Sequence, residues 1–211
     1  MDKDRIIRHE ISEIGKRLYE KGFSPGLSGN ISARLDDKIY ITPSGMNLGD
    51  VKDDDVVMMD ISGNILEEKK PSSERIMHLE IYKKRPDISA IIHCHAPKSS
   101  AFAVAGVPLT APILAENVFV LGPVPLAEYA MPSSQTLAEN VSDLLKTHEA
   151  VIMANHGVAV VGKTLQDAFY KMDTLEYYAE VYLWSKLLGR TRELSSEDVN
   201  KIVELRMIHN K

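Results

Sequence analysis

Apolar residues near the start of the chain recur at the spacing of a helix. They follow one another at intervals of three and four, with charged residues between them, at Ile7, Ile11, Ile14 and Leu18. This spacing places the apolar side chains on one helix face, and glycine commonly follows the last turn. The pattern predicts an amphipathic helix over residues 4–22, closing on Gly22.

The next two stretches have the short apolar runs and polar turns of hairpins. Residues 31–35 and 38–42 flank an Asp-Asp pair, and we predict a first hairpin there. Residues 56–60 and 65–66 flank a Ser-Gly-Asn turn, which indicates a second hairpin.

The middle of the chain changes between helical and strand patterns. The segment Pro71-Ser72-Ser73-Glu74 indicates a helix start, and this helix is expected to reach about Arg85 because Pro86 follows. Residues 88–94 are apolar and rich in β-branched side chains, which favours a buried strand. Residues 99–105 fit a short helix.

Proline is concentrated in the stretch that follows. Residues 106–132 contain Pro108, Pro112, Pro123, Pro125 and Pro132, so we expect an irregular connection and a candidate oligomer contact. The expected elements after it are a helix, two strands that form a hairpin, and a long helix, over residues 133–147, 151–154, 158–161 and 164–188.

Strands bracketed by helices and joined by short turns are typical of layered α/β domains. The 211 residues fit one domain, and their 44% hydrophobic and 26% charged composition is that of a globular protein. We therefore expect a single domain over residues 1–211, with a central, largely antiparallel sheet flanked by helices.

Charge and cysteine content exclude several classes. The net charge is −5 and the basic residues are scattered, so we expect no nucleic-acid partner. No apolar run reaches the roughly 18 residues of a membrane span. The lone cysteine, Cys94, cannot form an internal disulfide, and the first residues are charged where a secretory signal would be apolar. These features predict a cytoplasmic protein.

Histidines at strand ends form the first candidate site. His93 and His95 are two positions apart, so strand alternation points both to one face while Cys94 points away. His156 also ends an apolar strand, beside a glycine that permits a tight turn. Three imidazoles with an open fourth position are typical of catalytic zinc. The alternative from spacing alone is that they are structural histidines satisfied by hydrogen bonds.

The second candidate site is the segment Pro71-Ser72-Ser73-Glu74. It can be an ordinary helix start, with a serine cap and a carboxylate in the first turn. It can also be a phosphate cradle, because N–H groups and hydroxyls converge at a helix N-terminus. The polar turns Ser28-Gly29-Asn30 and Thr42-Pro43-Ser44-Gly45 could supply further donors.

Taken together, the polar motifs resemble those of the class II aldolase and adducin family, and of its sugar-phosphate aldolases in particular. The resemblance extends from the first helix to near Leu188. Its motifs, in chain order, are Gly29-Asn30-Ile31-Ser32, Ile41-Thr42-Pro43-Ser44-Gly45, Pro71-Ser72-Ser73-Glu74, His93-Cys94-His95 and Asn155-His156-Gly157.

This resemblance implies a site and an assembly. A zinc ion, or another divalent cation, would be held by His93, His95 and His156. Glu74 would lie beside it as the catalytic acid/base and as a fourth ligand when substrate is absent. The substrate phosphate would be bound by Gly29, Asn30, Ser44, Gly45, Ser72 and Ser73. The family is also expected to form a fourfold symmetric homotetramer with active sites between subunits.

The implied reaction is reversible retro-aldol cleavage of a ketose 1-phosphate such as fuculose 1-phosphate. The products would be dihydroxyacetone phosphate and a short aldehyde such as lactaldehyde. Breaking the C3–C4 bond leaves an enediolate, whose negative charge a divalent cation can stabilise. Glu74 would move the proton to and from the enediolate carbon.

The sequence departs from this family at the aldehyde end of the substrate. Related aldolases use tyrosines near the subunit boundary there, and residues 110–117 and 205–209 contain none. Candidate substitutes are Glu116, Tyr129 and His209. Three other functions remain open: a ribulose-phosphate 4-epimerase, a methylthioribulose-1-phosphate dehydratase, and a non-catalytic adducin-like binding module.

Overall fold

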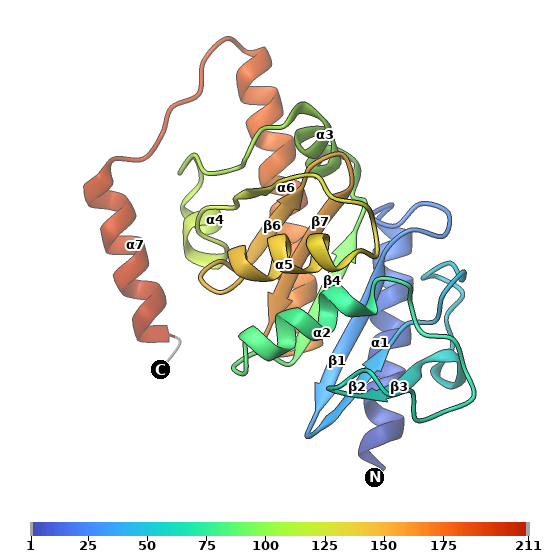
Figure 1. Cartoon of the computed structure of the whole chain (residues 1–211). Coiled ribbons are helices and arrows are strands. Elements are labelled where there is room, and N and C mark those ends of the chain that lie inside the picture. Colours follow the sequence, from blue (N-terminus) through green and yellow to red (C-terminus); the bar gives the residue numbers. More distant parts are fainter. Residues whose placement is uncertain (1, 210–211) are drawn as a thin grey trace.

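One seven-stranded sheet organises the computed structural model, which describes residues 2–209 (Figure 1). Its strands are β1 (Asn30–Leu35), β2 (Lys38–Ile41), β3 (Val57–Asp60), β4 (Ala90–Cys94), β5 (Leu126–Ala127), β6 (Ala150–Met153) and β7 (Gly157–Gly162). They lie in the order β3-β2-β1-β4-β7-β6-β5, and all neighbours are antiparallel except β5 and β6. The predicted α/β class with a largely antiparallel sheet is confirmed.

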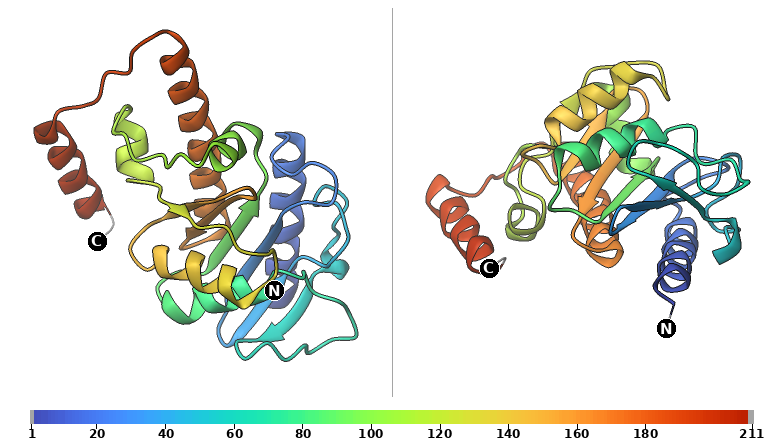
Figure 2. Two further views of the ribbon diagram at one scale, coloured as in Figure 1. Left: turned by 45° about the horizontal axis from the view of Figure 1, so that its top comes forward. Right: turned by 60° about the horizontal axis from the view of Figure 1, so that its bottom comes forward.

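Helices cover both faces of this sheet (Figures 1 and 2). They are α1 (Lys3–Glu20), α2 (Arg75–Lys84), α3 (Pro97–Ala105), α4 (Ala115–Val120), α5 (Gln135–Leu144), α6 (Leu165–Leu187) and α7 (Ser196–His209), with a 3-10 turn at Asp53–Asp55. One hydrophobic core joins the sheet to α1, α3 and α6, and a second joins it to α2 and α5.

Strand alternation divides side chains between the two cores. In β4, Ile92 and Cys94 lie in the core beneath α1, α3 and α6, whereas Ile91 lies in the core beneath α2 and α5. His93 shares the side of Ile91 by the same alternation and is fully buried. His93 therefore lies on the face of β4 that α2 covers.

Most of the expected elements form within two or three residues of their predicted ends. Hairpins join β1 to β2 and β6 to β7, and α6 is the long helix expected near the end of the chain. The second predicted hairpin is wrong in part, since residues 65–66 form no strand. A single bridge joins Met59 to Ile65, and the ladder partner of β3 is β2. Ile65 and Leu66 are both exposed, so no core contact extends the pairing.

Two further differences concern less patterned segments. The stretch 106–132 is not wholly irregular, because it contains α4 and the short parallel strand β5. Helix α7 was not expected; it packs against α4 and has no buried residue. Figure 2 shows it standing apart from the sheet. Within residues 2–209, no helix has the length and apolar character needed to cross a bilayer.

Sheet register brings distant polar residues to one place. Asn30 of β1 lies opposite His93 of β4, and Cys94 lies opposite Val158 of β7. The turn between β6 and β7, which carries His156, therefore adjoins the end of β4. Position 155, at this turn, has a left-handed backbone with φ of 52°, a conformation that asparagine tolerates well.

Candidate active site

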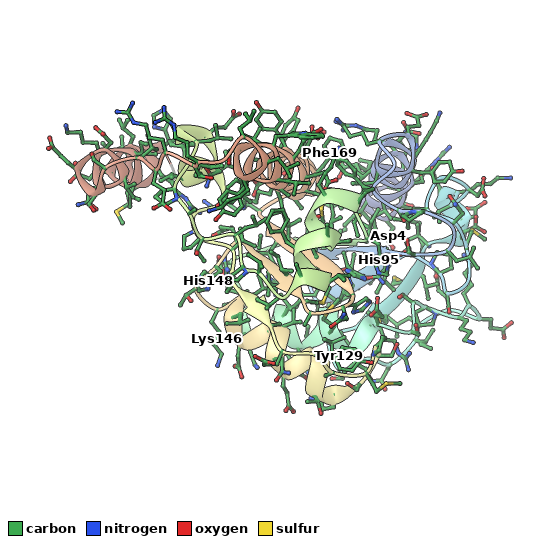
Figure 3. The ribbon with its side chains drawn as sticks, turned by 90° about the horizontal axis from the view of Figure 1, so that it is seen from above. Asp4, His95, Tyr129, Lys146, His148 and Phe169 are labelled. Atoms are coloured by element: carbon green, nitrogen blue, oxygen red, sulfur yellow. The ribbon has the colours of Figure 1, made fainter. Side chains whose placement is uncertain are left out.

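Three histidines converge where β4 meets the β6–β7 turn. One potential ligand atom from each of His93, His95 and His156 lies within 4.8 Å of the others. The Nε2 atoms of His93 and His95 are 3.1 Å apart. Figure 3 shows His95 toward the middle of the molecule in that view. Cys94 is buried in the opposite core, so the expectation that it points away from the histidines is confirmed.

A missing side chain makes room for this cluster. A Cβ atom on Gly157 would lie 2.5 Å from the Cys94 carbonyl oxygen and 2.8 Å from Cδ2 of His95. Real Cβ atoms essentially never approach that closely. Glycine at this position therefore lets β7 pass directly beside the histidines, as the sequence suggested.

Glu74 lies against the histidine cluster, just before the first turn of α2. Its Oε2 is 3.1 Å from Nε2 of His93, and its Oε1 is 3.3 Å from Nε2 of His156. The helix starts at Arg75, later than predicted, and the Glu74 side chain does not cap it. The carboxylate faces the histidines instead, and Asn30 donates a hydrogen bond to its Oε2 at 2.8 Å.

Charges within the cluster set its protonation. Burial alone would raise the pKa of Glu74, but the charges of His93 and His156 and the hydrogen bonds of His93 and Asn30 outweigh it and hold that pKa well below its usual range. Burial acts to lower the pKa of His93, whereas the Glu74 carboxylate raises it overall. Burial and the charge of His93 lower the pKa of His95 and of His156 to about 4. Near pH 7 the imidazoles of His95 and His156 are therefore neutral, and Glu74 is a carboxylate.

The donor set fits a divalent transition metal. Nδ1 of His93 is 2.9 Å from the Val158 carbonyl oxygen, which can only accept, so Nδ1 carries a hydrogen. Nε2 faces the Glu74 carboxylate, and a cation that displaced the hydrogen between them would bind the Nε2 lone pair. Metal-binding histidines commonly make this backbone hydrogen bond. Oε1 of Glu74 and Nδ1 of His156 are buried without a hydrogen-bond partner among the described residues. Three imidazoles and a carboxylate suit zinc.

The predicted phosphate segments lie side by side next to this cluster. The N–H of Ser44 donates to the Lys70 carbonyl oxygen, and that of Ser72 donates to the Thr42 carbonyl oxygen, each at 3.0 Å. The Thr42 hydroxyl also accepts from the N–H of Ile31 at 3.1 Å. The three polar turns are thus joined into one surface.

Only some groups of this surface are free to bind an anion. The N–H groups of Ser44 and Ser72 are used in joining the segments. Those of Gly45 and Ser73 have no acceptor within residues 2–209, and both residues are exposed. Gly29 has a left-handed φ of 81°, and a Cβ there would lie 2.9 Å from the His93 carbonyl oxygen. Glycine at 29 therefore lets this turn approach β4 closely at His93.

The three candidate substitutes for the family's tyrosine make no polar contact with the cluster within residues 2–209. Glu116, Tyr129 and His209 are exposed, and among the described residues none has a hydrogen bond or ion pair to the histidines or to Glu74. Tyr129, labelled in Figure 3, lies in the segment between β5 and α5. The ring of His209 instead contacts that of Phe119 on α4, with centroids 5.7 Å apart.

Sequence reasoning missed one polar side chain of this region, His78. It is fully buried on α2 and hydrogen bonded to Asn30. The signal was present, because Glu74, His78 and Tyr82 are spaced by four and lie on one helix face.

The chain is similar in sequence and in structure to known proteins of one family. The family described as Class II Aldolase and Adducin N-terminal domain matches residues 9–183. An L-fuculose phosphate aldolase of Methanocaldococcus jannaschii is 37% identical over 192 residues, covering 90% of this chain and 100% of that protein. A solved L-fuculose 1-phosphate aldolase superposes with a TM-score of 0.89 at 36% identity, covering 94% of each chain. A 3-oxo-tetronate 4-phosphate decarboxylase of Haemophilus influenzae is 35% identical over 175 residues, covering 81% of this chain and 83% of that protein.

Proposed function

Because the chain belongs to the class II aldolase and adducin family, we propose that it is a cytoplasmic, metal-dependent sugar-phosphate aldolase. Its substrate would be a ketose 1-phosphate resembling fuculose 1-phosphate, cleaved reversibly to dihydroxyacetone phosphate and a short aldehyde. The observation that carries this proposal is the contact of the Glu74 carboxylate with His93 and His156, next to the three joined polar turns.

The proposed cation is zinc, held by His93, His95 and His156. A bound divalent cation would stabilise the negative charge that develops on the substrate oxygens during cleavage. Glu74 would leave the ligand set when substrate enters, and its carboxylate would then accept or donate the proton at the carbon next to the ketone. Its position before the first turn of α2 gives the carboxylate a fixed backbone beside the histidines.

The polar turns would bind the phosphate end of the substrate. The free N–H groups of Gly45 and Ser73 and the hydroxyls of Ser44, Ser72 and Ser73 offer donors to a doubly charged anion, and Asn30 adds an amide. Holding the phosphate fixes the ketone end of the substrate relative to Glu74, so binding free energy is used for orientation.

Decarboxylation is the second candidate reaction, favoured by the similarity to the Haemophilus influenzae decarboxylase. A 3-oxo-tetronate 4-phosphate has its carboxylate two carbons from the ketone. Loss of CO₂ therefore leaves the same three-carbon enediolate phosphate as the aldol cleavage does. The reactions differ at the leaving end, because CO₂ needs no proton removed from a hydroxyl, whereas an aldehyde does.

The test is a product assay on the metal-loaded protein. Fuculose 1-phosphate, ribulose 5-phosphate, methylthioribulose 1-phosphate and 3-oxo-tetronate 4-phosphate are supplied separately, and dihydroxyacetone phosphate, aldehyde and CO₂ are measured. Aldehyde and dihydroxyacetone phosphate in equal amounts, abolished by a chelator, are expected. CO₂ without aldehyde would favour the decarboxylase, epimerised pentose the epimerase, and water loss the dehydratase. Inertness toward all four substrates would contradict the enzymatic proposal and favour a binding module.

We also propose a homotetramer with active sites between subunits. Apolar side chains near the end of α6 support it, since Trp184, Leu187 and Leu188 are more than half exposed in the isolated chain, at 57%, 69% and 85%. A second chain could also supply the acid that handles the aldehyde. Light scattering of the purified protein measures the mass, and a monomer at micromolar concentration would contradict this assembly.

A further inference from the structure

A buried chain of hydrogen bonds runs from α2 to the candidate base. Tyr82 OH lies 2.9 Å from Ser32 Oγ, and Ser32 Oγ lies 2.6 Å from Nδ1 of His78. Nε2 of His78 lies 2.5 Å from Oδ1 of Asn30, whose Nδ2 donates to Oε2 of Glu74 at 2.8 Å. Every residue in this series of hydrogen bonds is buried. The series links the interior of the protein to the Glu74 carboxylate, which contacts the histidine cluster.

The chemistry of the end group sets the direction of each hydrogen bond. A carboxylate only accepts, so Asn30 must turn its NH₂ toward Glu74 and its carbonyl oxygen toward His78. The Asn30 oxygen also only accepts, so Nε2 of His78 carries the hydrogen. Burial lowers the pKa of His78 to about 3, which leaves the ring neutral and Nδ1 unprotonated. Nδ1 then accepts from the Ser32 hydroxyl, and the Tyr82 hydroxyl donates to Ser32.

We propose that His78 is a positioning residue: its Nε2–H locks the Asn30 amide in the orientation that holds the Glu74 carboxylate beside His93. Without that donor the amide could turn over and set its oxygen against the carboxylate, which would push Glu74 away. The inference rests on the proposed role of Glu74 in the reaction. Among the described residues His78 has no hydrogen bond to the histidine cluster, and its one hydrogen bond to the polar turns is that with Asn30, so it acts through Asn30.

Two amide substitutions separate positioning from simple packing. In His78→Gln the side chain reaches as far as Nε2 and can keep a donor on Asn30. In His78→Asn the shorter side chain reaches only as far as Nδ1, so it can keep the Ser32 contact but not the Asn30 contact. Both variants are neutral and polar, and both leave space in the same core. A purely structural role would make their effects similar.

The experiment uses the 211-residue chain loaded with zinc. Zinc content, thermal midpoint, kcat and KM are measured with whichever phosphorylated substrate the wild type converts. Solvent exchange of the Asn30 side-chain hydrogens is followed by nuclear magnetic resonance. We expect His78→Asn to keep its zinc and lose at least tenfold in kcat, with faster Asn30 exchange. His78→Gln should recover most of both losses.

The outcomes are distinct. Equal kcat and equal Asn30 exchange in the two variants would overturn the positioning role, as would a His78 ring found with its hydrogen on Nδ1. If the wild type converts no substrate, the proposed function fails. The ring tautomer and the Asn30 exchange rates then still decide whether His78 orients Asn30, because neither measurement needs turnover.

Discussion

The α-carbon of Gly157 faces the carbonyl oxygen of Cys94 so closely that an added Cβ would lie 2.5 Å from it. The same atom would lie 3.2 Å from Cε1 of His93. The approach of β7 to the end of β4 that carries the candidate metal ligands thus depends on the absence of a side chain at position 157.

Gly157→Ala should therefore damage the histidine cluster. The obstruction is backbone, which cannot rotate away, so we expect a loss of about 1–3 kcal/mol in unfolding free energy and weaker zinc binding. Urea unfolding and a competitive zinc titration measure the two effects. Gly22→Ala is the control, since its φ of 73° is unfavourable for alanine but no atom lies within 4 Å of the added Cβ. Equal zinc affinity in both variants would contradict the argument.

His95→Ala should remove zinc, because a three-histidine set loses a third of its nitrogen ligands. Cys94→Ala provides the neighbouring comparison, as its side chain points into the opposite core and should affect stability but not metal content. Elemental analysis after dialysis gives the metal per chain. Retention of full zinc by His95→Ala, or its loss from Cys94→Ala, would overturn the ligand assignment.

Glu74→Gln should keep zinc and lose turnover. Glutamine preserves the shape of the side chain but cannot exchange a proton at neutral pH, and such a group contributes about 10²- to 10⁴-fold in rate. The most direct assay is incorporation of deuterium from heavy water into dihydroxyacetone phosphate, which requires proton transfer but no aldehyde. Undiminished exchange in the variant would assign the proton to another residue.

Ser73→Ala should raise KM for a phosphorylated ketose without a large change in stability. The exposed Ser73 side chain makes no hydrogen bond within residues 2–209, so its removal affects the fold little. Ser134 is the control because it caps α5 by accepting from the N–H of Leu137, and Ser134→Ala should cost about 0.5–2 kcal/mol with KM unchanged. Equal cleavage of phosphorylated and unphosphorylated ketoses by the wild type would exclude a phosphate site here.

His78 should make the protein sensitive to acid. Burial lowers its pKa from 6.5 to about 3. Below pH 6.5 the imidazole therefore binds a proton in the unfolded chain but stays neutral in the folded chain. Unfolding free energy should thus fall by about 1.4 kcal/mol between about pH 7.5 and about pH 5.5 from this residue alone. His78→Gln should lack that part of the pH dependence. Parallel pH profiles of urea unfolding for the two proteins would show that His78 is not held neutral.

The histidine cluster could be anticipated because it follows from local rules. Strand alternation places His93 and His95 on one face independently of the rest of the fold. The glycine beside His156 indicates that the backbone there approaches another part of the protein closely. The contact of His156 with Glu74 needed tertiary information, since it depends on β7 pairing with β4 and on α2 crossing that face.

Other features could not be derived from spacing. Helix α7 is a different case, because Val199, Ile202 and Val203 do follow helical spacing and are half-buried, yet no helix was predicted after residue 188. The role of His78 depends on Asn30 and Ser32 from another strand, and a single buried histidine in an amphipathic helix looks like any core residue. The prediction of a second hairpin was wrong in part because the side chains of residues 65–66 are exposed and pack against no core.

The candidate metal ligands come from the start of α2, the end of β4 and the β6–β7 turn, segments that are far apart along the chain. An unfolded polypeptide must close two loops to bring them together, and this lowers its conformational entropy before any ligand contact compensates for the loss. Zinc should consequently bind only after β4 has paired with β7, late in folding, and act as a cross-link that slows unfolding. During synthesis, the nascent chain would then leave the ribosome without metal and acquire it as a nearly finished domain.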